Sequence, residues 1–176
     1  RSQPGWLLSL PFAKHRAGST FFSRAGGLDM EISAWFLAIF VLIWIAGPLT
    51  QVLFLAAPKL HHRLGMTEDE ALKPEFRWFL LDEKAIAIAD LTYFISGGAF
   101  IWLALLGNQA ALIFGLYSCA CYVYIAPLAI SRWHLLGKNH LSPMSRAQAP
   151  IYMAYMAVYF CFGLYGLFYL WGHARV

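Results

Sequence analysis

The sequence predicts an all-α integral membrane protein, a four-helix transmembrane bundle with a partly helical cytoplasmic connection. Hydrophobic residues make up 60% of the 176 residues and charged residues only 12%, whereas soluble domains average about 45–50% and ~25%. Four runs are each long enough to cross a bilayer, which takes about 20 apolar residues. None of these runs alternates like a strand, and lipid offers the backbone no hydrogen-bond partners, so each run is expected to be helical.

The first expected span covers residues 33–57 and carries no charge. Before it lies an arm, residues 1–32, with four basic residues and no acid before Asp29. Three interpretations of this arm stay open: a targeting segment, an arm at the membrane surface, or sequence upstream of a true start at Met30. We favour the start at Met30, because it leads directly into the first span.

The second and third expected spans, residues 85–106 and 110–131, form a hairpin. Only Gly107-Asn108-Gln109 separates them, and so short a connection joins antiparallel neighbours. The second span holds one charged residue, Asp90, and the third holds none.

The connection before the second span, residues 58–84, is expected to be partly helical. Thr67 and Glu70 have the spacing of a capping box, which starts a helix. Pro74 then suits the first turn of a second helix. That helix is expected to continue through the membrane to the end of the second span.

The fourth expected span covers residues 151–172, followed by a tail at residues 173–176. The connection before it, residues 132–149, is polar, and Ser142-Pro143 has the pattern of a helix start. Pro150 is expected to bend the chain near the membrane surface. A single transmembrane domain, residues 33–172, therefore follows the arm.

Small side chains at helical spacing predict where the hairpin helices meet, because they permit close packing in lipid. On the third span this face is formed by Ala111, Gly115 and Cys119. On the second span it is formed by Ala85, Ala89 and Gly97, interrupted by Tyr93. We expect the two faces to pack against each other, with Gly115 directed at the second span.

Asp90 is the one ionisable residue well inside an expected span. A charge at the centre of a membrane helix costs about 2.5–3.5 kcal/mol on insertion scales, so we expect Asp90 to face the bundle interior near Tyr93. Glu83, Lys84 and Arg132 lie on the same membrane side and are the ion-pair candidates. Two interpretations stay open: a carboxylate that handles protons or a substrate, and a structural ion pair.

A row of tyrosines on the fourth span supplies further candidates. Tyr152, Tyr155 and Tyr159 follow one another at helical spacing, and Gly163 and Gly166 continue the row. The ligand-binding candidates are therefore Asp90, Tyr93, Tyr152, Tyr155 and Tyr159. The alternative is that the row packs against a neighbouring helix, which is the usual role of such spacing.

The distribution of basic residues predicts the orientation. Eight of the 13 Lys and Arg residues fall in the two long connections: Lys59, Arg63, Lys73, Arg77, Lys84, Arg132, Lys138 and Arg146. Loops rich in Lys and Arg stay in the cytoplasm. We therefore expect a multi-pass protein, placed in a bacterial inner membrane, with cytoplasmic connections and both termini outside.

The sequence lacks the motifs of several functional classes. The sequence has no phosphate-binding loop, zinc spacing or nucleic-acid platform, so we expect no nucleic acid, metal or cofactor. The histidines that follow the first and third spans, His61, His62, His134 and His140, sit at helix ends or in loops. Axial haem ligands would instead be needed on facing helices.

Three functions remain. The favoured one is the binding or transport of a small or lipophilic molecule within the bundle. The second is an accessory subunit of a larger membrane complex. The third, a membrane enzyme acting on a lipid-like substrate, is less favoured, because a catalytic site needs at least two reactive groups and only one intramembrane acid is present. Besides the lipid bilayer, the expected partner is a second copy or a larger complex.

Overall fold

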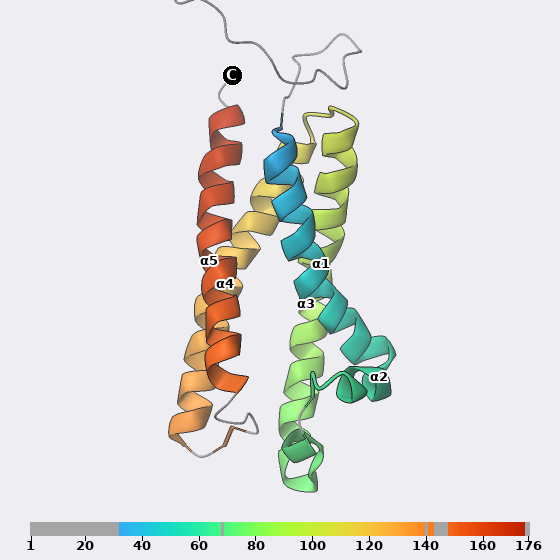
Figure 1. Cartoon of the computed structure of the whole chain (residues 1–176), viewed down its shortest axis with the longest axis vertical. Coiled ribbons are helices and arrows are strands. Elements are labelled where there is room, and N and C mark those ends of the chain that lie inside the picture. The colour runs from blue at the N-terminus through green and yellow to red at the C-terminus, as the bar shows by residue number, and fades with distance from the viewer. Residues whose placement is uncertain (1–31, 68, 140, 143–147, 175–176) are drawn as a thin grey trace, which may run out of the picture.

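The computed structural model describes residues 32–67, 69–139, 141–142 and 148–174, and over these residues it is helical with no strand. Four helices are long and apolar enough to cross a membrane (Figure 1). They are α1 (Ala34–Ala56), α3 (Arg77–Leu105), α4 (Ala111–Lys138) and α5 (Gln148–His173). Between α1 and α3 lie α2 (Pro58–Arg63) and two 3-10 turns, η1 (Asp69–Leu72) and η2 (Pro74–Phe76). The arm expected at residues 1–32 lies almost wholly outside the described residues.

Helix α1 begins where the sequence predicts. The Ser33 hydroxyl accepts a hydrogen bond from the backbone N–H of Phe36 (3.2 Å) and so caps the first turn. Within the helix, Pro48 has no N–H to donate to the preceding turn. Next to this defect, the carbonyl of Ile43 accepts a hydrogen bond from the Tyr159 hydroxyl of α5 (2.9 Å). A weak point of α1 is thus supported by another helix.

The connection after α1 differs from the expected capped helix. Residues 69–72 form only a 3-10 turn, and the Thr67 hydroxyl lies 2.7 Å from Nδ1 of His61. The side chain of Glu70 lies outside the described residues. The prediction for Pro74 is confirmed, because the helical run that begins there continues to Leu105.

The hairpin between α3 and α4 is confirmed. Gly107 has φ +67°, a conformation that other residues rarely adopt, and the Asn108 side chain accepts a hydrogen bond from the N–H of Ala110 (2.9 Å). Helix α4 continues to Lys138, beyond the expected end of the span at residue 131. Its last two turns therefore extend into the charged end of the bundle.

The predicted contact face is right for α4 and wrong for α3. Ala111, Gly115 and Cys119 are buried, and a Cβ at Gly115 would lie 2.7 Å from Phe100 of α3 and from Leu170 of α5. On α3, however, Ala85 and Ala89 are exposed. Gly97 faces Trp44 of α1 instead. The reason is shape: the Trp44 indole needs the flat surface at Gly97, where it donates a hydrogen bond to the carbonyl of Phe94 (2.8 Å).

Helix α5 packs closely on α4, and the glycines of its row are packing residues. A Cβ at Gly163 would lie 2.9 Å from the carbonyl oxygen of Cys119. A Cβ at Gly166 would collide with the sulfur of the same residue. Pro150 lies in the first turn of α5 and does not bend the chain between elements, because proline is tolerated in the first turn. The expected helix start at Ser142-Pro143 falls at residues 143–147, outside the described part.

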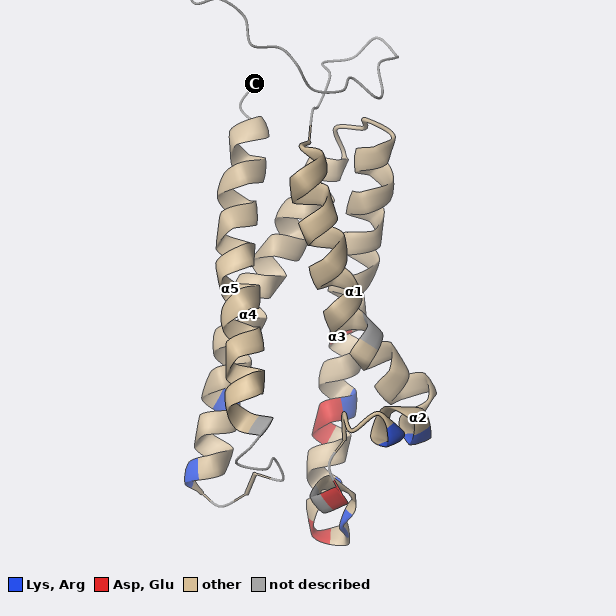
Figure 2. Cartoon of the chain, in the orientation of Figure 1, with Lys and Arg blue, Asp and Glu red and all other residues tan. Residues whose placement is uncertain are grey.

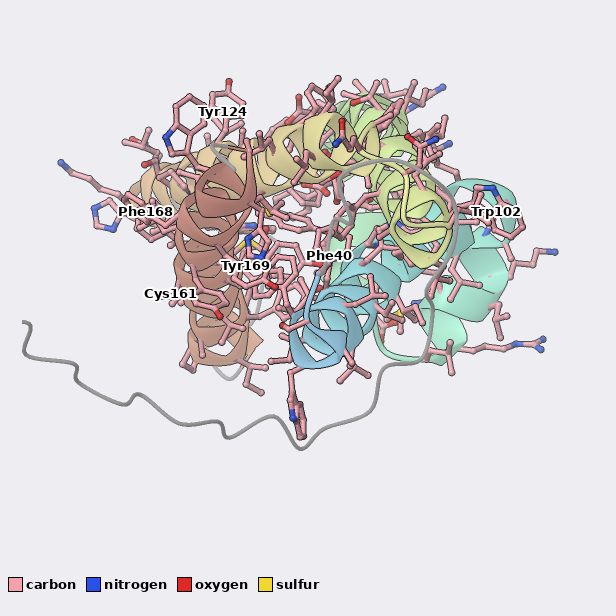
Figure 3. All side chains as sticks on the ribbon, turned by 90° about the horizontal axis from the view of Figure 1, so that it is seen from above. Phe40, Trp102, Tyr124, Cys161, Phe168 and Tyr169 are labelled. Atoms are coloured by element: carbon pink, nitrogen blue, oxygen red, sulfur yellow. The ribbon has the colours of Figure 1, made fainter. Side chains whose placement is uncertain are left out.

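An aromatic core joins the four helices in the half of the bundle far from α2. Phe36 stacks on Tyr169 (4.3 Å between ring centroids) and Phe40 meets Phe100 edge-on (4.5 Å). Figure 3 shows Phe40 and Tyr169 pointing inward, whereas Trp102, Tyr124, Cys161 and Phe168 point away from the bundle. Phe168 is 77% exposed and Trp35 is 80% exposed. Large apolar side chains therefore cover the outside as well as the core.

The charged side chains of the described residues gather at one end of the molecule (Figure 2). This end holds α2, the start of α3 and the end of α4, so the two long connections lie together. The α3–α4 hairpin and the described ends of the chain lie at the other end. At the charged end the helices form two arms, α1 with α3 and α4 with α5 (Figure 1).

Candidate functional site

A cavity of about 540 Å³ lies between the two arms at the charged end. All four long helices contribute to it. Its lining is Thr50, Gln51, Phe54, His61, Gly65, Met66, Thr67, Ala71, Phe79, Leu80, Glu83, Trp133, Ile151, Tyr152 and Tyr155. Binding pockets for small molecules typically measure about 300–1,000 Å³ and combine apolar walls with a few polar groups. Both the size and the lining fit that description.

Aromatic rings form a continuous wall from one arm to the other. Phe79 of α3 lies 5.4 Å from Trp133 of α4, and Trp133 lies 5.6 Å from Tyr152 of α5, measured between ring centroids. On the opposite side, the Phe54 ring lies 5.3 Å from the imidazole of His61. The rings hold the shape of the cavity, because each is fixed by its neighbour.

Arg132 ties the arms together at the edge of this wall. Its guanidinium donates hydrogen bonds to the carboxylate of Glu83 and to Oδ2 of Asp82 (2.5 Å). It also lies over the rings of Phe79 (5.1 Å) and Trp133 (5.7 Å), within the range of cation–π attraction. Of the three ion-pair candidates, the structure thus brings Glu83 and Arg132 together.

Two further charged residues, Lys84 and Asp82, adjoin Glu83 on α3. Lys84 is exposed, and none of the ion pairs found among the described residues includes it. Sequence reasoning missed Asp82, which adjoins Glu83. The sequence did contain an indication: Asp82 and Glu83 are consecutive acids just before a span, and together they offer a guanidinium two partners.

Asp90 lies deeper in the bundle, behind the cavity. It is only 8% exposed, and Tyr93, one turn further along α3, is also buried. In the described part of the chain no basic side chain forms an ion pair with it. Asp90 does not line the cavity.

The tyrosine candidates divide between the cavity and the core. Tyr152 and Tyr155 line the cavity. The Tyr155 hydroxyl donates to that of Tyr159 (2.8 Å), which in turn donates to the carbonyl of Ile43 (2.9 Å). This row of hydroxyls leads from the cavity into the bundle. Tyr93 is also buried there and does not touch the cavity.

Tyr122 of α4 is a buried polar residue that sequence reasoning missed. Its ring lies 5.0 Å from Tyr159 and 5.8 Å from Tyr93. Its hydroxyl is fully buried and has no hydrogen-bond partner among the described residues. The spacing of Tyr122 from Gly115 and Ser118 places it on the buried face of α4, and that was the available signal.

The loop that closes the cavity is held by histidine. Nδ1 of His61 lies 2.7 Å from the Thr67 hydroxyl, and Nδ1 of His62 lies 3.0 Å from the Thr67 carbonyl oxygen. Burial lowers the pKa of His61, because an imidazolium loses hydration there. Among the described residues no three His, Cys, Asp or Glu side chains are placed to hold a metal ion.

The arrangement can bind an apolar molecule against aromatic rings and meet one polar group with Glu83, Thr67 or the tyrosine hydroxyls. Comparison with known proteins assigns no family, since no family model, no curated protein and no solved structure matches the chain. The geometry of the cavity therefore carries the functional argument.

Proposed function

We propose that the chain is a multi-pass membrane protein that binds a small lipophilic molecule in the cavity between its two arms. The observation that carries this proposal is the cavity itself: about 540 Å³, walled by aromatic rings and supplied with a few polar groups. Glu83, Tyr152 and Tyr155, three residues that the sequence singled out, line it.

The outer surface supports the membrane placement. The four long helices expose large apolar side chains around the bundle, a surface that water disfavours and lipid tails accept. The charged residues sit at one end, where the headgroup region and water would meet them. In this placement the cavity lies near the membrane surface, where an amphiphilic molecule could enter between the arms.

Binding is better supported than transport or catalysis. The cavity faces the charged end of the bundle, and the aromatic core fills the other half. Transport would require that core to open. Within the cavity, Glu83 is paired with Arg132, and a catalytic site needs at least two reactive groups. The accessory-subunit role remains the alternative that a failed binding experiment would favour.

The proposal is tested with a neutral probe, 2-(4-butylphenyl)ethanol, on the purified full chain in lipid nanodiscs. We expect the probe to raise the midpoint of thermal unfolding, because a ligand that binds only the folded state stabilises it. Leu80→Trp should abolish this shift by filling the cavity, since Leu80 lines it. Ile88→Trp, on the exposed side of the same helix, should preserve it. An unchanged response in Leu80→Trp contradicts the proposal, as does a parent chain that responds neither to this probe nor to its amine and carboxylic acid analogues.

A further inference from the structure

We propose that the cavity selects lipophilic amines, with the ammonium group beside Glu83 and the apolar body against the aromatic wall. This inference rests on the proposed binding function and names the class of ligand. It follows from the charge of the cavity, from the aromatic chemistry of its wall and from the ion pairs that already occupy Arg132.

Among the described residues that line the cavity, the one acidic side chain is Glu83, and no Lys or Arg lines it. Helix α3 brings Asp82, Glu83 and Asp90 to this region, whereas Arg132 is the one basic side chain that pairs with them among the described residues. Asp82 and Glu83 share the single positive charge of Arg132, so this group of three side chains carries a net negative charge. A cation entering the cavity is therefore attracted, and an anion is repelled.

Glu83 provides the point of contact. It is the only acidic or basic residue other than His61 that lines the cavity among the described residues. Arg132 donates to its Oε1, but an ionised carboxylate offers about four acceptor positions. An ammonium group can thus share Glu83 without displacing Arg132. Burial lowers the pKa of His61, so at neutral pH this second lining group adds no positive charge.

The wall suits a cation as well as an apolar body. Arg132 already lies over the rings of Phe79 and Trp133 at 5.1 and 5.7 Å, so these ring faces accept positive charge in the folded protein. The Trp133 ring continues into Tyr152, where a second cation can find a ring face. Cation–π attraction is strongest where water is excluded, as it is between buried rings.

An alcohol or an acid gains less from this site. A hydroxyl can hydrogen-bond to Glu83 or to Tyr155 but gains no charge attraction. A carboxylate would face Glu83, while the guanidinium of Arg132 is already occupied by Glu83 and Asp82. The order of affinity expected for one apolar body is therefore amine, then alcohol, then acid.

The test compares three probes that share one body: 2-(4-butylphenyl)ethylamine, 2-(4-butylphenyl)ethanol and 4-butylphenylacetic acid. Their dissociation constants are measured by calorimetry on the full chain in phosphatidylcholine nanodiscs at pH 7.4, with empty nanodiscs to subtract partitioning. We expect the amine to bind about tenfold tighter than the alcohol. Equal or tighter binding of the alcohol overturns the amine inference and leaves the proposed function standing. If none of the three binds, both are overturned.

Two variants locate the selectivity. Glu83→Gln should reduce the amine-to-alcohol affinity ratio to about one, because the amide keeps the shape of Glu83 but not its charge. Asp82→Asn is the matched control, since it disturbs the same Arg132 but does not line the cavity. Asp82→Asn should keep most of the amine-to-alcohol affinity ratio. Equal loss of this ratio in Glu83→Gln and Asp82→Asn would overturn the role of Glu83. If Glu83→Gln does not fold, the three-probe comparison on the parent chain still decides the inference.

Discussion

Three helices, α3, α4 and α5, meet closely at Gly115. A Cβ there would lie 2.7 Å from the side chains of both Phe100 on α3 and Leu170 on α5. Both neighbours are fully buried, so neither can move aside without disturbing the aromatic core. The close approach depends on the missing side chain.

Gly115→Leu is therefore expected to destabilise the protein. Overpacking of a buried site typically costs about 1–3 kcal/mol, and we expect a lower midpoint of thermal unfolding in detergent. Gly137→Leu is the matched control, because Gly137 lies on the same helix with open space around it. Equal stability of the two variants would place Gly115 outside the packed interface.

Asp90 and Glu83 are expected to respond differently to loss of charge. Asp90→Asn should leave thermal stability close to that of the parent, because no basic group in the described part pairs with Asp90 and the amide keeps the hydrogen-bonding shape. Glu83→Gln should cost roughly 1–3 kcal/mol, because it weakens a partly buried hydrogen bond between charged groups. A loss in Asp90→Asn as large as that in Glu83→Gln would assign Asp90 an ion-pair partner.

Sequence reasoning could place Asp90 but not its surroundings. The cost of a charge in lipid requires an interior position, and Asp90 is buried. Which acid takes Arg132 depends on the rotation of α4 against α3, and no sequence spacing fixes that rotation. Tyr122 lies three residues after Cys119 on the buried face of α4, but a face predicted from small side chains alone does not show which large side chain joins it.

At the scale of elements, the lengths of the apolar runs predicted the long helices reliably. The expected start of the first span at residue 33 differs from that of α1 by one residue, and the three-residue connection correctly predicted the hairpin. The contact face of α3 was wrong because small residues only permit close packing. Trp44 occupies the small-residue face at Gly97, and Ala85 and Ala89 remain exposed.

The loop that contains α2 is expected to loosen in mild acid. Burial lowers the pKa of His61 in the folded protein, so the folded state binds this proton less readily than the unfolded chain. The stability that follows is fully present above the unfolded value of about 6.5 and is lost as the pH falls through the lower folded value. Hydrogen exchange of residues 58–67 should therefore rise between pH 7.5 and 5.5, after correction for intrinsic rates.

Two variants assign this response. His61→Gln should remove the pH dependence, because glutamine does not titrate. His62→Gln should retain it, although His62 contacts the same Thr67. A response that persists in His61→Gln would mean that another group in the loop controls the loop.

At the scale of the whole molecule, the cavity could not be predicted from the sequence. The four spans predict a bundle, and a bundle of straight helices would close along its length. Two of the long helices carry an internal proline, Pro48 in α1 and Pro127 in α4, and α1 is followed at once by α2, which turns away from the bundle (Figure 1). Proline kinks a helix, but its direction depends on what packs beside it. Here Tyr159 meets the carbonyl of Ile43 one turn earlier.

The last prediction concerns the orientation of the molecule, on the proposal that it spans a bacterial inner membrane. The two long connections lie at one end of the bundle and carry most of the basic residues, so the positive-inside rule places that end in the cytoplasm. Single cysteines at Asn108 and Asn139 test this in a background with Cys119, Cys121 and Cys161 replaced by alanine. Both positions are exposed, at opposite ends of α4.

An impermeant maleimide added to intact spheroplasts should label Asn108→Cys at once and Asn139→Cys only after the membrane is permeabilised. The two positions control for each other, because both follow from one orientation and must respond in opposite ways. The reverse pattern would invert the protein and move the cavity to the outer face. Immediate labelling of both would mean that the four long helices do not separate their two ends by a membrane, and the bundle would then need another partner to cover its apolar surface.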